Sequence, residues 1–152
     1  MKNLSEAAVK NEVLQRIAKL QPGARACWGR MSAGQVICHL SDAFRLSLGE
    51  KSASPATSIF HRTVMKWGAL YVPVQWPRGF RTRPEMEQGV GGTPPSEFER
   101  DKLALSALIE RFSNPRSDIQ WAVHPIFGRM SSSEWMRWGY LHSDHHLRQF
   151  GA

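Results

Sequence analysis

The chain has 152 residues, of which 41% are hydrophobic and 22% are charged, and its formal net charge is +7. These values are typical of one globular domain with its own core, and we treat residues 1–152 as a single domain. The sequence has no apolar run of roughly eighteen residues, which excludes a membrane-spanning helix, and its charged start does not resemble a signal peptide. We therefore expect a cytoplasmic protein with no membrane partner.

The positive charge is concentrated in one segment. Residues 51 to 84 contain no acidic residue and six basic ones, namely Lys51, Arg62, Lys66, Arg78, Arg81 and Arg83. Such a segment can bind an anionic substrate or a phosphate backbone, or it can simply be solvated. The aromatic residues between the arginines suit base stacking, but they equally suit a loop packed on a core. We therefore do not expect nucleic acid to be the partner.

Two helices are predicted in the first third of the chain. Apolar residues recur at helical spacing from about residue 5 to residue 20, and Gln21-Pro22-Gly23 ends that helix. Ser32, with Gln35 three positions later, has the spacing of a capping box, so a second helix should begin there. This second helix should extend to about Leu48.

The middle of the chain is less regular. Residues 59–71 predict a short helix, but five prolines and four glycines between residues 72 and 95 exclude a long regular element. An irregular segment of this length within a compact domain is often a lid or binding loop. A third long helix is predicted to begin near Pro95 and to end before Asn114-Pro115.

The last helix should begin at Ser131, which has capping-box spacing to Glu134, and extend to about Phe150. Four long amphipathic helices with one proline-rich excursion between the second and the third predict an all-α, antiparallel bundle. On a helical wheel, one stripe of the last helix is about 120° wide and includes two tryptophans, so it should point inward. This stripe contains Trp135, Trp138, Gly139, His142, His145, His146 and Gln149.

A metal site is one interpretation of these histidines. His142 and His146 are one helical turn apart, and His39 on the second helix could complete a set of three nitrogens. Neutral imidazoles suit zinc, nickel, copper and iron, and three of them leave positions open for water or a thiolate. Such an ion lowers the pKa of bound water or thiol. The alternative is that these histidines are hydrogen-bonded core residues, because histidines four residues apart also occur by chance.

Two segments resemble signatures of the DinB/YfiT-like superfamily. Residues 28–40 are similar to its second-helix signature, in which a tryptophan, a Ser or Thr cap and a Gln precede the first metal-binding histidine. Residues 142–149 are similar to its last-helix signature, two histidines four residues apart followed by a Gln. His124-Pro125-Ile126-Phe127-Gly128 and Glu134-Trp135 resemble a branch of unknown function. Residues 50–93 match only loosely.

The resemblance implies an up-and-down four-helix bundle, commonly a homodimer. It assigns His39, His142 and His146 as ligands of one divalent metal, with zinc or nickel favoured and iron, manganese or copper as alternatives. Characterised members include thiol transferases that use bacillithiol, mycothiol or glutathione, and related isomerases. We therefore expect a metal-dependent enzyme that activates a thiol or water toward a small-molecule substrate, as a thiol S-transferase or hydrolase. The alternative is a non-enzymatic, metal-stabilised dimeric binding module, and no catalytic residue is assigned.

Four further residues are candidates for supporting the metal or binding substrate: His145, Gln149, Asp42 and Arg81. His145 lies beside the ligand pair, Gln149 could orient a ligand, Asp42 could supply a carboxylate, and Arg81 could bind an anionic group. Each also has an ordinary structural explanation, such as core packing or a helix cap. His124 is expected to tie a loop to the bundle. The two cysteines, Cys27 and Cys38, are expected to be reduced and mostly buried.

Overall fold

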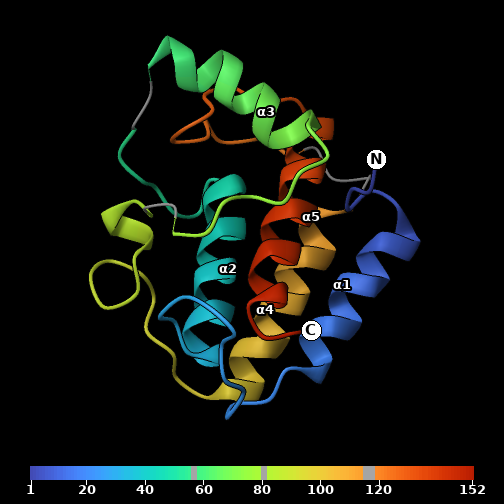
Figure 1. Cartoon of the computed structure of the whole chain (residues 1–152), viewed down its shortest axis with the longest axis vertical. Helices are drawn as coiled ribbons and strands as arrows, with labels where there is room; N and C mark the ends of the chain where they lie inside the picture. The colour runs from blue at the N-terminus through green and yellow to red at the C-terminus, as the bar shows by residue number, and fades with distance from the viewer. Residues whose placement is uncertain (56–57, 80–81, 115–118) are drawn as a thin grey trace.

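The structure is a computed structural model that describes residues 1–55, 58–79, 82–114 and 119–152 (Figure 1). These residues form helices and no β-strand, so the predicted all-α class is confirmed. Five α-helices are present, and two short elements of other helical type accompany them. In chain order they are α1 (Ala7–Lys19), α2 (Ala33–Ser47), the π-helical turn η1 (His61–Met65), α3 (Lys66–Tyr71), the 3-10 turn η2 (Pro84–Met86), α4 (Phe98–Phe112) and α5 (Ser132–Arg148).

Both predicted capping boxes are present. The Ser32 hydroxyl accepts from the backbone N–H of Gln35 (3.2 Å), and the Gln35 side chain accepts from the Ser32 N–H (2.9 Å). Ser131 and Glu134 repeat this exchange over 3.2 and 2.7 Å at the start of α5. Each box satisfies two N–H groups that a helix start leaves without partners. α2 and α5 therefore begin where the sequence predicted.

The start of α4 was predicted too early. The helix begins at Phe98, because the Glu97 carboxylate accepts from the backbone N–H groups of Glu99 and Arg100 (3.1 and 2.8 Å) and caps it there. Asp101 meanwhile accepts from both the N–H and the hydroxyl of Ser96, each over 2.8 Å. These bonds hold Ser96 in the loop before the helix.

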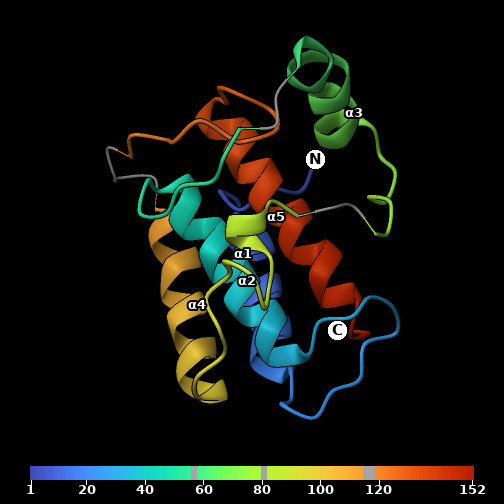
Figure 2. The same cartoon turned by 90° about the vertical axis from the view of Figure 1, so that its left-hand side faces the viewer.

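The four long helices pack against one another in pairs. α2 contacts α4 and α5, and α1 contacts the same two helices. α3 contacts α5 and lies across one end of the long helices, away from α1 (Figures 1 and 2). The described residues thus contain five α-helices: four long ones, and the short α3 at residues 66–71, which lies within the short helix predicted for residues 59–71.

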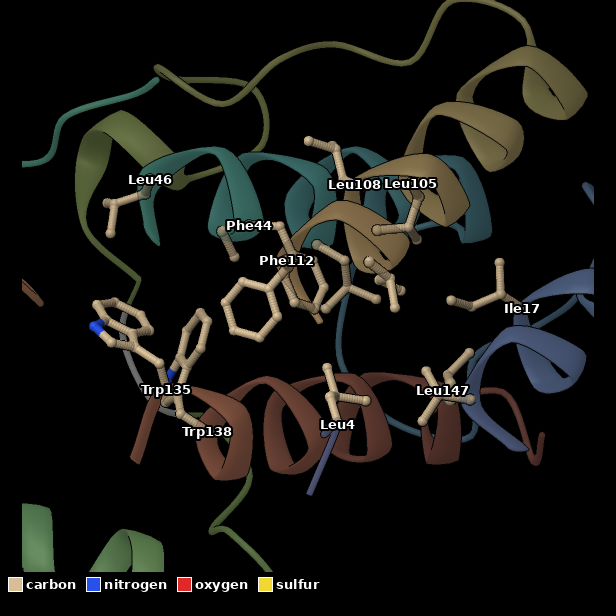
Figure 3. Close-up of a cluster of buried hydrophobic side chains, with 14 of the residues drawn as sticks. Leu4, Ile17, Phe44, Leu46, Leu105, Leu108, Phe112, Trp135, Trp138 and Leu147 are labelled. Carbon is tan, nitrogen blue, oxygen red and sulfur yellow. The ribbon is translucent and has the colours of Figure 1, made fainter. Parts of the chain in front are cut away.

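The hydrophobic core lies between the four long helices (Figure 3). The rings of Phe44 on α2 and Phe112 on α4 meet edge to face at 4.8 Å, and Trp138 of α5 lies 6.4 Å from Phe44. Leu4 joins this core because its N–H donates to the carbonyl of Met136 over 3.1 Å, which fixes the start of the chain on α5. Burying each such side chain contributes roughly 1.5–3 kcal/mol, so this core holds α2 firmly against α5.

The remaining segments cover the ends and one side of the helices. In Figure 2, η2 lies in front of α2, with which it is in contact. His124 was expected to tie a loop to the bundle. Its buried Nδ1 accepts from the N–H groups of Ile126 and Phe127 within that loop (3.1 and 3.0 Å), and its ring lies 5.4 Å from the rings of Trp135 and Trp138 on α5. Among the described residues, no helix combines the length and apolar character needed to cross a bilayer.

Candidate metal centre

Three histidines from two helices meet in the structure. His39 lies in the middle of α2, while His142 and His146 lie one turn apart on α5. Because α2 and α5 are in contact, the imidazoles converge: Nε2 of His142 is 3.3 Å from Nε2 of His39 and 3.1 Å from Nε2 of His146. The sequence prediction that these three residues come together is therefore met by the structure.

This spacing fits the donor set of a metal ion. Ligand nitrogens 2.0–2.1 Å from a tetrahedral zinc ion are about 3.3 Å from one another. The two Nε2 separations in the cluster have nearly that length, and all three ligand atoms lie within 4.8 Å of one another. The cluster thus needs little rearrangement to bind one ion.

Hydrogen bonds at the outer nitrogens orient two of the rings. Nδ1–H of His39 donates to the backbone carbonyl of Met86 over 3.1 Å, and Nδ1–H of His146 donates to Oε1 of Gln149 over 2.7 Å. A neutral imidazole has one N–H, so Nε2 of both rings presents a lone pair to the centre. Only His142 could bring a proton there, and one N–H can satisfy only one of the two facing nitrogens. A cation would satisfy all three.

Burial keeps the three rings neutral. It lowers the pKa of His39, and it lowers the pKa values of His142 and His146 well below the ordinary value, with neighbouring histidines adding to the effect. Neutral imidazoles are the form that binds metal. At pH 7 the cluster is therefore ready to accept a cation without first releasing protons.

One side of the cluster is accessible. His39 and His146 are only 5% and 7% exposed, whereas His142 is partly exposed. The ring of Trp138 packs against His142 at 4.8 Å, and Trp76, from the irregular segment, lies 6.1 Å away at a tilt. His142 is therefore the most exposed member of the cluster.

His145 lies at this accessible side and outside the cluster. Its ring meets Trp28 edge to face at 4.8 Å and lies 6.1 Å from Trp76. Burial, followed by the charge of Arg148, lowers its pKa to about 4, and its buried Nδ1 has no hydrogen-bond partner among the described residues. His145 is thus a neutral imidazole between two indoles, and it is not part of the cluster of three histidines.

Gln149 and Asp42 have different positions. Gln149 is 5% exposed and orients His146, as the sequence suggested. The fully buried carboxylate of Asp42 does not join the three ligands, because it binds Lys51 and Thr93 instead. Asp42 was a candidate for supporting the metal or binding substrate, and its charge lies close enough to influence the pKa of His39.

Several basic side chains of residues 51–84 have partners within the protein. Arg78 stacks over the Trp28 ring at 5.1 Å, Arg83 donates to Ser54 over 2.6 Å, and Lys66 pairs with Glu134 over 2.8 Å. Arg81, the predicted anion-binding residue, lies outside the described residues. These three side chains therefore already have partners within the protein, and they do not form a continuous patch of free positive charge.

Sequence reasoning missed three parts of the site and misplaced one cysteine. The Met86 carbonyl, Trp76 and Gly29 were not assigned. Gly29 has φ +87°, and a Cβ there would lie 2.6 Å from Nε2 of Gln149, so the glycine next to Trp28 was the available signal. Of the two cysteines, Cys38 is buried as expected, but Cys27 is exposed.

The fold and the site define an all-α protein with a buried cluster of three histidines that can hold one metal ion. The chain belongs to the family described as "Protein of unknown function (DUF1569)", whose sequence profile matches residues 3–152. Searches of curated proteins and of solved structures each found no match. The family match does not extend to the DinB/YfiT-like superfamily, so that relationship stays a prediction.

Proposed function

We propose that the protein is a metal-dependent enzyme in which His39, His142 and His146 bind one divalent cation, zinc or nickel first among the candidates. The observation that carries this proposal is the convergence of three Nε2 atoms, two of which present lone pairs because their Nδ1–H groups are hydrogen-bonded elsewhere. Without a cation, the described groups leave at least one of these buried lone pairs without a donor, which is costly.

An enzyme is favoured over a purely structural site by the number of ligands. The described residues bring three metal-binding side chains together, and Asp42, the candidate for a fourth, is bound to Lys51 and Thr93. Structural zinc sites use four protein ligands, whereas catalytic sites keep one position open. The partial exposure of His142 supports an open position that faces solvent.

A metal held there would lower the pKa of a bound thiol or water and so provide a nucleophile at neutral pH. The protein's own groups would position the other reactant. Trp28, Trp76 and His145 surround the accessible side, and Arg78 adds a positive charge over Trp28. These groups suit a small substrate with a flat or apolar part, and the reaction proposed is a thiol transfer or a hydrolysis.

We infer that the four long helices are the up-and-down four-helix bundle of the DinB/YfiT-like type, with α3 as an addition in the excursion. The mutual packing of α1, α2, α4 and α5 supports this, as does the origin of the ligands, one from α2 and two from α5. The non-enzymatic alternative has the same fold and the same metal, and it differs only in lacking turnover.

The homodimer is also a proposal, and one surface supports it. Six apolar side chains around η1 and α3 are between 40% and 83% exposed, and we call them the α3 surface: Ile59, Phe60, Val64, Trp67, Tyr71 and Val74. Together they leave on the order of 600 Å² uncovered, so two copies would bury about 1,200 Å², the lower limit of a stable interface. None of the six is charged, while the basic residues of the same two elements are Arg62 and Lys66, of which Lys66 is paired with Glu134.

Metal analysis tests the central claim. The purified protein is stripped with a chelator, loaded with Zn²⁺ or Ni²⁺, desalted and analysed for bound metal. One ion per chain is expected for the wild type and for His61→Ala, a histidine in η1 outside the cluster, and much less for His142→Ala. Equal metal in the His142→Ala protein, or none in the wild type, would overturn the site.

Turnover is tested separately. The loaded wild type is incubated with a panel of low-molecular-weight thiols and an electrophilic substrate, and thiol consumption is followed. A rate above that of His142→Ala supports an enzyme. Metal binding without any such rate across thiol and hydrolytic substrates would favour the binding module.

A further inference from the structure

A compact loop covers the α2 side of the metal centre. Residues 84–93, which begin with η2, are closed by hydrogen bonds from the N–H of Gly91 to the carbonyl of Pro84 (3.0 Å) and from the N–H of Gly92 to the carbonyl of Glu87 (2.9 Å). A Cβ at Gly91 would lie 2.8 Å from the Pro84 carbonyl oxygen, so the two ends of this loop are in close contact. We call this segment the 84–93 loop.

The 84–93 loop is attached to α2 at two points. The first is the bond from His39 Nδ1–H to the carbonyl of Met86. The second is Asp42, whose carboxylate accepts from the N–H and the hydroxyl of Thr93 over 2.8 and 2.6 Å. His39 and Asp42 are three residues apart on one helix, so the two attachments lie on the same face.

Lys51 closes the second attachment. Its ammonium binds the Asp42 carboxylate over 2.7 Å and the carbonyl of Gly91 over 3.2 Å. Burial alone would raise the pKa of Asp42, but the hydrogen bonds from Lys51 and Thr93 outweigh it and the pKa is lowered. The fully buried side chain is therefore ionised at pH 7, and it holds the end of the loop through charge-assisted bonds.

We propose that Asp42 is a positioning residue for the metal centre: by fixing Thr93 and Lys51 it holds the 84–93 loop so that the Met86 carbonyl orients His39. This inference rests on the proposed function, because the oriented ring is a proposed ligand. Groups that hold the outer nitrogen of a ligating histidine set its tautomer and direction and raise its basicity. If the closed loop raises the metal affinity by some factor, thermodynamic linkage requires that bound metal raise the equilibrium constant for loop closure by the same factor.

Asp101 offers a matched control. Its carboxylate accepts from the N–H and the hydroxyl of Ser96 over 2.8 Å each, the same arrangement that Asp42 makes with Thr93. That pair attaches a loop to α4, and Asp101 also accepts from the Cys38 thiol over 3.7 Å. Among the described residues, neither Asp101 nor Ser96 is a partner of Met86 or belongs to the cluster of three histidines. Asp101→Asn therefore removes a comparable attachment between a carboxylate and a loop, and it should leave metal affinity unchanged.

The experiment compares Zn²⁺ affinity, by competition with a chromophoric chelator, in the full-length protein and its variants. Asp42→Asn should weaken binding by about tenfold and Thr93→Val by three- to tenfold, because they act one contact away from a group that orients a ligand. Thr93→Ser, which keeps the hydroxyl donor, should restore wild-type affinity. Asp101→Asn should bind as tightly as wild type even if its stability falls.

Hydrogen exchange gives the second readout. In the wild type, Zn²⁺ should slow exchange of the amides of Gly91, Gly92 and Thr93, and this protection should shrink in Thr93→Val and return in Thr93→Ser. Wild-type affinity in both Asp42→Asn and Thr93→Val overturns the inference, as does an equal loss in Asp101→Asn. A wild type that binds no Zn²⁺ overturns the proposed function itself, so the two failures are distinguishable.

Discussion

The Nδ1 atom of His146 donates a hydrogen bond over 2.7 Å to Oε1 of Gln149, the residue that caps the end of the same helix. The carbonyl of Gln149 in turn accepts from the N–H of Cys27 over 2.6 Å, so the segment before α2 packs on the end of α5. Gly29 leaves room for the Gln149 amide. The orientation of His146, one of the three proposed ligands, thus depends on residues more than a hundred positions away in sequence.

Removing this hydrogen bond should weaken metal binding. Gln149→Ala leaves the tautomer of His146 unconstrained, and we expect a 10–100-fold loss in Zn²⁺ affinity, measured by chelator competition. Gln149→Glu keeps an acceptor at the same place and should retain or increase affinity. If the alanine variant binds as tightly as the glutamate variant, Gln149 does not orient the ligand.

Gly29→Ala should disturb the same contact from the other side. The new Cβ would lie 2.6 Å from Nε2 of Gln149, and the backbone at φ +87° disfavours any side chain. We expect a smaller loss of Zn²⁺ affinity than in Gln149→Ala, by the same titration. Gly23→Ala, where a Cβ would have nothing within 4 Å, is the control and should not change affinity.

Gly139 should be important for stability because the core leaves no room for a side chain there. It is buried on α5, and a Cβ there would lie 2.9 Å from Leu4 and 3.0 Å from the Phe112 ring. Overpacking should outweigh the gain in helix propensity, so Gly139→Ala should lower the free energy of unfolding in urea by about 1–2 kcal/mol. Gly68→Ala in α3, where the space is open, should be neutral or stabilising by up to about 1 kcal/mol. Equal stability of the two variants would contradict this account.

His124 should make stability depend on pH. Burial lowers its pKa to about 3, while the unfolded chain keeps a value near 6.5. Between these values the unfolded state binds the additional proton, so the stabilising contribution is complete above pH 6.5 and is lost as pH falls toward 3. From pH 6 to pH 5 this single group should cost about 1 kcal/mol.

The variant His124→Asn isolates that contribution. Its Oδ1 can accept from the N–H groups of Ile126 and Phe127, as Nδ1 of the histidine does, but it does not titrate. Urea unfolding of wild type and variant at pH 6 and pH 5, in the same metal state, should show a smaller decrease for the variant by about 1 kcal/mol. Parallel decreases would mean that His124 is not the residue responsible.

The α3 surface should mediate self-association with a second copy of this chain. Trp67→Glu would place a charge on an apolar surface, and we expect it to convert a dimer to a monomer in sedimentation equilibrium. Leu103→Glu is the matched control, because Leu103 is 71% exposed on α4 and lies outside this surface. A monomeric wild type, or a dimer that persists in Trp67→Glu, would refute the proposal. Vesicle binding by a monomeric wild type would indicate a membrane as the occupant instead.

Local patterns were sufficient to predict much of this protein. Helix periodicity and the two capping boxes located α2 and α5, because a serine and an acceptor three residues later can satisfy two N–H groups at a helix start. The same periodicity placed His142 and His146 on one inward face, and Gln149 one turn beyond. The all-α class and two of the three cluster positions followed from spacing alone, while the metal itself and the reaction are still proposals.

Only the tertiary structure decided what His39 and Asp42 contact. Both lie on α2, but His39 joins the α5 histidines while Asp42 binds Lys51 and Thr93. Periodicity places a side chain on a face of a helix, yet it carries no information about which loop covers that face. The path of residues 84–93, and with it the Met86 carbonyl behind His39, depends on contacts between distant segments. Those contacts decide that His39 belongs to the histidine cluster and that Asp42 does not.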